Sequence, residues 1–309
     1  MCLVIRNTGS TYIVLTDEGQ QIECRIKGNF RIKGIRTTNP VAVGDRVDIA
    51  VQKDGTAWIT KIEQRKNYII RRATNLSKQG HIIAANIDLT ALIITINHPV
   101  TSLTFIDRFL ATAEAYNIPA CLIINKSDLY NAAEIVEAEQ ITNLYQSIGY
   151  PVYQISAVNC QDSDLRNQIS EIFAGKTVLL SGNSGVGKST LLNTLLGEEV
   201  ARTQEISAVH DTGMHTTTFS QMYPFAGGWI IDTPGIKGFG TLDMKKTEID
   251  HYFPDIFRIA HYCKYDDCLH IDEPQCAVLK ALENGTLPLS RYRSYLSVLD
   301  DYDESKYRY

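Results

Sequence analysis

The segment "GNSGVGKS" has the composition and spacing of a loop that binds the phosphates of a nucleotide. It matches G-x-x-x-x-G-K-[S/T], follows the apolar run "TVLLS" and leads into the helical run "TLLNTLLG". In such loops backbone N–H groups cradle the phosphates, the lysine offsets β- and γ-phosphate charge, and the serine ligates Mg²⁺. The candidate phosphate-binding residues are Gly182, Asn183, Ser184, Gly185, Val186, Gly187, Lys188, Ser189 and Thr190.

A second element, "GGWIIDTPG", places Asp232 at the end of an apolar run, where its carboxylate can hold Mg²⁺ through a water. Gly235 has no side chain, so its N–H can approach the γ-phosphate. The intervening "GMHTTTFS" offers three threonines that could complete the Mg²⁺ shell, Thr216, Thr217 and Thr218, of which Thr217 is favoured. The predicted magnesium ligands are therefore Ser189, Thr217 and Asp232.

The segment "NKSD" could read a guanine base. The Asp128 carboxylate can accept hydrogen bonds from guanine N1–H and N2–H₂, whereas adenine would leave this carboxylate unpaired. Asn125 would bond the O6/N7 edge, and the Lys126 stem would cover the base plane. The next apolar run ends in "ISA", where the Ala157 N–H could reach O6 and Ser156 could brace the loop. The candidates are Asn125, Lys126, Ser127, Asp128, Ser156 and Ala157. A P-loop ATPase is the alternative function, and it requires that Asp128 plays no part in base recognition.

The segment "CKYDDCLHIDEPQC" concentrates metal-binding side chains near the C-terminus. Three thiolates and one imidazole form a standard tetrahedral zinc set, and the zinc is structural when the protein fills all four positions. The predicted ligands are Cys263, Cys268, His270 and Cys276. His251 and His261 are lower-ranked alternatives to His270. The other cysteines, Cys2, Cys24, Cys121 and Cys160, are predicted to be ordinary thiols.

The elements that must position these groups alternate between strands and helices. This pattern implies a parallel, doubly wound sheet with helices on both faces. The motifs follow the order NKSD, SA, phosphate loop, threonine segment and DTPG, whereas the conventional order begins with the phosphate loop. A parallel sheet can be cut and rejoined if its natural termini lie close together. We therefore predict a circularly permuted α/β P-loop GTPase domain over residues 71–242.

The segments on either side have different patterns. About five short strands separated by Gly and Asn-Pro predict an OB-type β-barrel over residues 1–70. Residues 1–72 hold 13 Lys and Arg against 7 Asp and Glu, while the whole chain has a net charge of −5. This asymmetry suggests that the barrel binds RNA, with Phe30 available to stack on a base. Residues 243–309 are predicted to form a mainly helical, zinc-binding domain.

Bulk composition excludes several classes of protein. No apolar run approaches the roughly 18 residues that span a bilayer, and the first residues do not have the form of a secretory signal. Cytosolic thiols stay reduced, so the 7 cysteines do not suggest a disulfide framework. We expect a cytoplasmic monomer without a membrane partner.

The inverted motif order, with "NKSD", "GNSGVGKST", "HTTT" and "DTPGI", a barrel in front and the Cys/His cluster behind, resembles the ribosome small-subunit-dependent GTPase A (RsgA) family over essentially the whole chain. The resemblance implies a late-acting assembly factor of the small (30S) ribosomal subunit that binds GTP, GDP, Mg²⁺ and 16S rRNA. It also implies that subunit-stimulated hydrolysis releases the factor.

Catalysis is the least defined part of this resemblance. Ile236 stands where Ras-like GTPases have a glutamine that orients the attacking water, so intrinsic hydrolysis should be slow. His215 resembles the histidine proposed in the family to position that water. The alternative function is a slow, nucleotide-gated RNA-binding module in which hydrolysis acts only as a timer.

Overall fold

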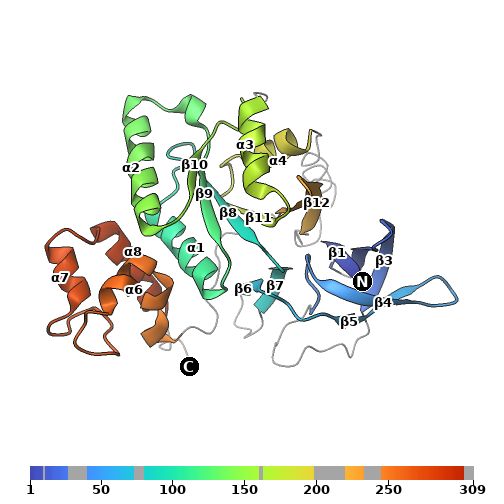
Figure 1. The fold of residues 1–309 in the computed structure, drawn as a ribbon, viewed down its shortest axis with the longest axis horizontal. Coiled ribbons are helices and arrows are strands. Elements are labelled where there is room, and N and C mark those ends of the chain that lie inside the picture. The colour runs from blue at the N-terminus through green and yellow to red at the C-terminus, as the bar shows by residue number, and fades with distance from the viewer. Residues whose placement is uncertain are drawn as a thin grey trace, which may run out of the picture.

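The computed structural model describes residues 1–9, 11–26, 40–72, 80–159, 163–197, 220–232 and 245–302. A β-barrel and a C-terminal helical unit lie on opposite sides of a central α/β unit (Figure 1). Several residues singled out from the sequence lie outside these ranges: Phe30, Cys160, His215, Thr216, Thr217, Thr218, Gly235 and Ile236. Within the described ranges, no helix is long and apolar enough to cross a membrane.

The barrel consists of five short strands. They are β1 (Cys2–Asn7), β2 (Tyr12–Leu15), β3 (Gln21–Ile26), β4 (Arg46–Val51) and β5 (Ala57–Ile62). The order β1-β2-β3-β5-β4 returns to β1 through the β1–β4 pairing, which closes the barrel. Among these five described strands, the β3–β5 pairing is parallel and the other pairings are antiparallel. Inward side chains such as Val4, Tyr12 and Ile59 alternate with more exposed ones, as a half-buried barrel wall requires.

The central sheet has the strand order β10-β9-β8-β11-β13-β12. Its strands are β8 (Leu89–Ile94), β9 (Ala120–Ile124), β10 (Val152–Gln154), β11 (Thr177–Ser181), β12 (Gln221–Phe225) and β13 (Gly228–Asp232). All are parallel except β12, which pairs antiparallel with β13. Strands β8 and β9 are buried at every residue because helices cover both faces of the sheet, which explains their continuous apolar sequences.

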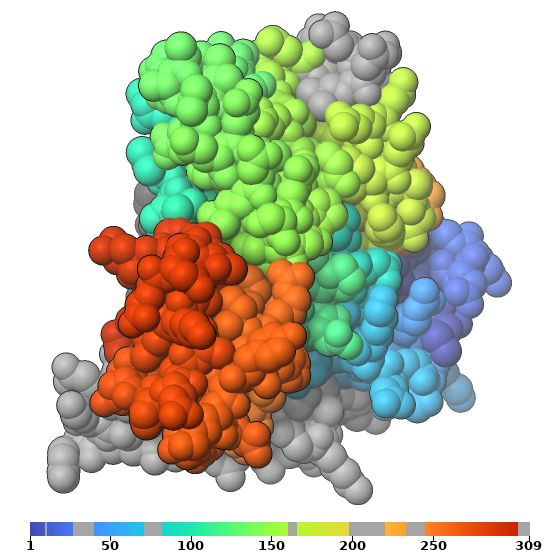
Figure 2. Space-filling view, turned by 60° about the vertical axis from the view of Figure 1, so that its left-hand side comes forward, coloured from blue at the N-terminus to red at the C-terminus, as the bar shows by residue number. Residues whose placement is uncertain are grey.

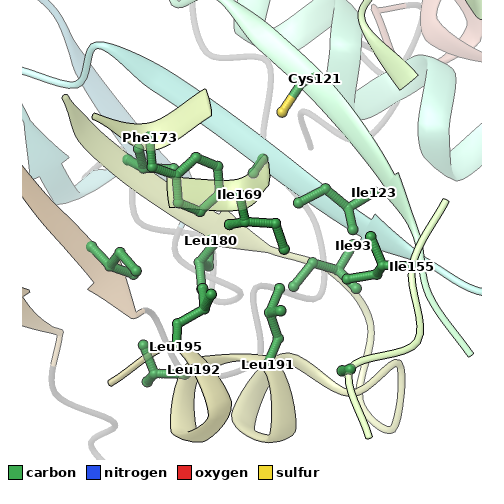
Figure 3. Packing of buried hydrophobic residues seen from close by; sticks show 14 of the residues in the cluster. Ile93, Cys121, Ile123, Ile155, Ile169, Phe173, Leu180, Leu191, Leu192 and Leu195 are labelled. Atoms are coloured by element: carbon green, nitrogen blue, oxygen red, sulfur yellow. The ribbon is translucent and has the colours of Figure 1, made fainter. Parts of the chain in front are cut away.

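In the described part of the chain, two helices cover each face of the sheet. The helices α1 (Leu103–Ala115) and α2 (Ala132–Ile148) pack on one face. The helices α3 (Ser163–Phe173) and α4 (Lys188–Leu196) pack on the other. Figure 3 shows the second core, where Leu191 and Leu195 of α4 and Phe173 of α3 face Leu180 and Ile93 of the sheet. Strand side chains alternate between the two cores, so the sheet is fixed from both sides.

Close backbone contacts join the barrel to the central unit. A hairpin of β6 (Tyr68–Arg72) and β7 (Gly80–Ala85) lies between them. The Ala85 N–H donates to the Val43 carbonyl at 2.9 Å. Gly44 has φ +90°, and a Cβ there would lie 2.1 Å from the Ala85 carbonyl oxygen. Strand β1 also pairs with β12, so barrel and central strands form one continuous eleven-stranded sheet.

The C-terminal unit contains two single-turn 3₁₀-helices, two short α-helices and one longer α-helix in its described residues. Its elements are η2 (Lys246–Glu248), η3 (Asp250–Tyr252), α6 (Pro254–Ala260), α7 (Ala277–Glu283) and α8 (Leu289–Tyr302). Helix α8 packs along α1, and Figure 2 shows this unit against the central unit.

A buried ion network fixes that packing. The Arg291 guanidinium, 1% exposed, contacts Asp107 of α1 at 2.5 Å and Asp255 of α6 at 2.6 Å. The Tyr145 hydroxyl of α2 donates to the same Asp107 carboxylate at 2.6 Å. Burial opposes the guanidinium charge, but the two carboxylates outweigh it and raise the pKa of Arg291. Removing one member would leave a buried charge unpaired, so the C-terminal unit is held in a defined position on α1 and α2.

Candidate functional site

The predicted nucleotide-binding loops meet at one edge of the central sheet. The loop after β9 begins at Asn125 and the loop after β11 begins at Gly182, with β8 between the two strands. Both loops lie at the same edge because parallel strands end there. The loop after β10 contains Ala157, and β13 ends at Asp232. The predicted guanine and phosphate loops therefore lie at one edge of the sheet, although their order along the chain is inverted.

Asn125 lies where three of these loops meet, and its side chain is buried. Its Nδ2 donates to the Val186 carbonyl at 2.8 Å, and its Oδ1 accepts from the Ala157 N–H at 2.9 Å. We predicted that Asn125 and the Ala157 N–H would contact the base. In this structure they bond to each other, so Asn125 also organises the site. Its amide retains a second N–H and a second lone pair for a ligand.

The neighbouring loop is braced in a similar way. The Ser156 Oγ accepts from the Asn159 N–H at 3.4 Å, and the Thr194 hydroxyl of α4 donates to the Ala157 carbonyl at 3.1 Å. The loop after β10 is thereby tied to the helix that follows the phosphate loop.

Two glycines of the phosphate loop are required by packing. Gly187 has φ +96°, and a Cβ there would lie 2.3 Å from the Asn125 Nδ2. Gly182 has φ +146°, and its Cβ would lie 2.4 Å from the Ile93 carbonyl oxygen. The glycines at these two positions therefore allow the loop to contact the neighbouring strand ends, and they also leave room for a phosphate.

Lys188 and Asp232 place opposite charges in a partly buried region. The Lys188 ammonium donates to the carbonyls of Gly182 and Asn183, at 2.6 and 2.7 Å. Burial lowers the pKa of Lys188 although Asp232 opposes the shift, and burial raises the pKa of Asp232 although Lys188 opposes it. A bound polyanion would favour the charged lysine, and a divalent cation would favour the charged carboxylate. Ser189 and Thr190 are exposed at the start of α4.

The rest of the NKSD segment forms a turn in which Asp128 is exposed and Lys126 and Ser127 are half-buried. Lys126 has φ +66° and donates from Nζ to the His98 carbonyl at 2.5 Å. The Ser127 N–H donates to the Ile155 carbonyl at 3.1 Å, and Asp128 is exposed in the turn η1 (Ser127–Leu129). Sequence reasoning did not identify His98, because no nucleotide motif includes it.

The four predicted metal ligands form one cluster. The ligand atoms of Cys263, Cys268, His270 and Cys276 all lie within 4.8 Å of one another. The His270 Nδ1 is 3.4 Å from the Cys276 Sγ, while its Nε2 faces the Asp250 carboxylate at 3.6 Å. Burial raises the pKa of Cys268 to about 12 and also raises that of Cys276, so these thiols stay neutral unless a cation lies among them. The donor set and the carboxylate behind the imidazole fit a zinc ion.

The surrounding residues hold this cluster in place. The Tyr292 and Tyr295 hydroxyls of α8 donate to the carbonyls of His270 and Leu269, at 2.7 and 2.9 Å. The alternative ligands His251 and His261 instead pack against Phe257. Their ring centroids lie 4.6 and 4.7 Å from the centroid of the Phe257 ring.

Comparison with known proteins identifies the family. The model of the RsgA GTPase matches residues 62–242, and that of the RsgA N-terminal domain matches residues 2–59. The chain belongs to the RsgA GTPase family. The small ribosomal subunit biogenesis GTPases RsgA of Phocaeicola vulgatus and Bacteroides fragilis are each 58% identical to it, over 99% of this chain and 98% of theirs.

Solved structures agree with this assignment. YjeQ from Thermotoga maritima has a TM-score of 0.74 and 30% identity, covering 97% of each chain. YloQ, described as a circularly permuted GTPase, has a TM-score of 0.71 and 29% identity, covering 100% of this chain and 96% of its own. The predicted family and fold class, a permuted α/β GTPase unit behind an OB-type barrel, are confirmed. The individual site residues and the domain boundaries stay predictions.

Replacing Gly187 with Ala should weaken GDP binding by at least about tenfold, because the new Cβ would displace the Asn125 amide and strain a left-handed backbone. Gly197→Ala is the matched control, since Gly197 also has positive φ, at +72°, but faces open space. Titration with a fluorescent GDP analogue measures both affinities. Equal affinities for the two variants would show that the Gly187–Asn125 contact does not support the RsgA nucleotide site.

Proposed function

We propose that this chain is a GTPase that acts in late maturation of the small ribosomal subunit. The observation that carries this proposal is 58% identity over nearly the full length of curated small ribosomal subunit biogenesis GTPases. The convergence of the predicted guanine and phosphate loops at one sheet edge supports it independently of the names. We place the chain in the cytoplasm and expect a monomer.

Nucleotide binding is assigned to the residues named from the sequence. The exposed Asp128 carboxylate accepts from guanine N1–H and N2–H₂, and Lys126 covers the base. The Lys188 ammonium exchanges its two loop carbonyls for phosphate oxygens of GTP. Mg²⁺, when bound with GTP, offsets the phosphate charge, and Ser189, Thr217 and Asp232 are the residues that would hold it.

Hydrolysis is expected to be slow without a partner. Ile236 cannot orient or deprotonate water, because its side chain is aliphatic. We assign the positioning of the attacking water to His215, and we expect docking on the subunit to be needed for this role. Hydrolysis would then release the protein from the mature subunit.

Subunit binding is assigned to the two flanking units. The excess of basic residues in the N-terminal barrel suits contacts with the phosphates of 16S rRNA. Cys263, Cys268, His270 and Cys276 would hold one zinc ion, whose role is structural because four protein ligands complete its shell. Zinc would tie together a C-terminal unit whose helices α6 and α7 are each only 7 residues long.

Replacing Cys276 with Ser should lower the zinc content from about one ion per chain to well below one half, because one of four ligands is lost. It should also expose residues 245–302 to proteolysis, since the metal links their loops. Cys2→Ser is the control, because Cys2 lies in β1 and should leave zinc content unchanged. Elemental analysis and limited digestion measure the two effects. Wild-type protein purified without bound zinc would contradict the assignment.

The function is tested by the GTP hydrolysis rate with and without purified small subunits. We expect stimulation of at least about tenfold, because the subunit supplies the water-positioning contact that Ile236 cannot make. Large subunits at the same concentration are the control, and His215→Ala should abolish most of the stimulation. A rate that small subunits leave unchanged would contradict this account and favour the alternative, a slow nucleotide-gated RNA-binding module in which hydrolysis acts as a timer.

A further inference from the structure

One hydroxyl group joins the ends of β8 and β9 beside the predicted guanine site. The Tyr130 hydroxyl donates to the Asn125 carbonyl at 2.5 Å and accepts from the Ile96 N–H at 3.2 Å. Tyr130 is half-buried, and burial raises the pKa of its phenol, so the hydroxyl stays protonated and able to donate at neutral pH. A single side chain thus satisfies one backbone group from each strand end.

Two further hydrogen bonds tie residues 97 and 98 to the loop after β9 and to the start of α2. The Lys126 ammonium donates to the His98 carbonyl at 2.5 Å. The Asn97 amide donates to Glu134 at 2.8 Å, and Glu134 also caps the start of α2. Residues 96–98 therefore form a support behind the loop that carries Asp128.

The position of Asp128 depends on this support. The loop leaves β9 at Asn125, and Asp128 follows within a single turn of 3₁₀-helix. The Asn125 side chain is held by Val186 and Ala157, whereas its carbonyl is held by Tyr130. The orientation of this peptide group sets the direction of the chain toward Asp128. A carboxylate that must accept two hydrogen bonds from one base edge tolerates little change in that direction.

We propose that Tyr130 is a positioning residue for guanine recognition, which acts by fixing the NKSD loop against residues 96–98. The inference rests on the proposed function, since it concerns the same guanine site. Tyr130 would not touch the nucleotide. It would lower the dissociation constant for guanine nucleotides by holding Asp128 in place before the base arrives.

Tyr150 provides a matched control. It is more deeply buried than Tyr130, but both rings pack in the core under α1 and α2, and the Tyr150 hydroxyl donates to the Glu114 side chain at 2.8 Å. That bond lies outside the NKSD loop and residues 96–98. Each Tyr→Phe change removes one hydroxyl and keeps the ring. Comparing the two variants therefore separates the general effect of losing a buried hydroxyl from the loss of the Tyr130 hydrogen bonds to Asn125 and Ile96.

The experiment compares Tyr130→Phe, Tyr150→Phe and wild type for binding of GDP and of inosine diphosphate, which lacks the guanine 2-amino group. We expect Tyr130→Phe to raise the GDP dissociation constant about three- to tenfold and to narrow the GDP preference over inosine diphosphate, because a misplaced Asp128 gains less from the 2-amino group. The KM for GTP should rise while kcat is kept. Tyr150→Phe should match wild type in all of these.

Two results would overturn the inference. One is a Tyr130→Phe protein with wild-type GDP affinity and wild-type base preference. The other is a Tyr130→Phe protein with a lowered melting temperature but an unchanged ratio of the two affinities, which would make the hydroxyl merely structural. A wild-type protein that binds neither nucleotide would instead overturn the proposed function, and this inference with it.

Discussion

The site depends on one buried amide. Asn125 bonds the loop after β11 through Val186 and the loop after β10 through Ala157, while its own backbone extends β9. The residues predicted to bind guanine and phosphate lie in different loops, and this side chain bonds those loops to each other. The absence of a side chain at Gly187 makes room for that amide. Elements that look like separate motifs in the sequence therefore share one packing constraint.

Circular permutation changes how this site is connected to the rest of the chain. Strand β13 ends at Asp232, and the next described residues, from Lys245, already belong to the C-terminal unit. Arg291 fixes that unit on α1 and α2 through Asp107 and Asp255. The chain after Asp232 therefore leads into a unit that is packed on α1 and α2. This arrangement suits a protein whose nucleotide state alters how it docks on a large partner.

Motif spacing and strand–helix alternation were enough to predict the sheet, its permuted order and the loops at its edge, because those patterns are local. Contacts between residues far apart in sequence could not be predicted in this way. Arg291 and Asp107 pair across most of the chain, and nothing around either residue marks the partner. Tyr130 resembles any partly buried tyrosine until the neighbouring strand end places Ile96 against it. The assignment of Asn125 to the guanine site stays a prediction, and its contacts with Val186 and Ala157 appear only when the loops at the sheet edge are placed together.

The central claim is that the permuted chain forms a guanine-specific site in which Asp128 recognises the base. Competition binding of GDP against ADP tests this most directly, with Asp128→Asn and xanthosine diphosphate as the second arm. The account predicts that GDP binds at least about 100-fold more tightly than ADP, and that Asp128→Asn transfers the preference to the xanthine nucleotide. Equal competition by ADP, or an Asp128→Asn protein that still prefers GDP, would contradict it.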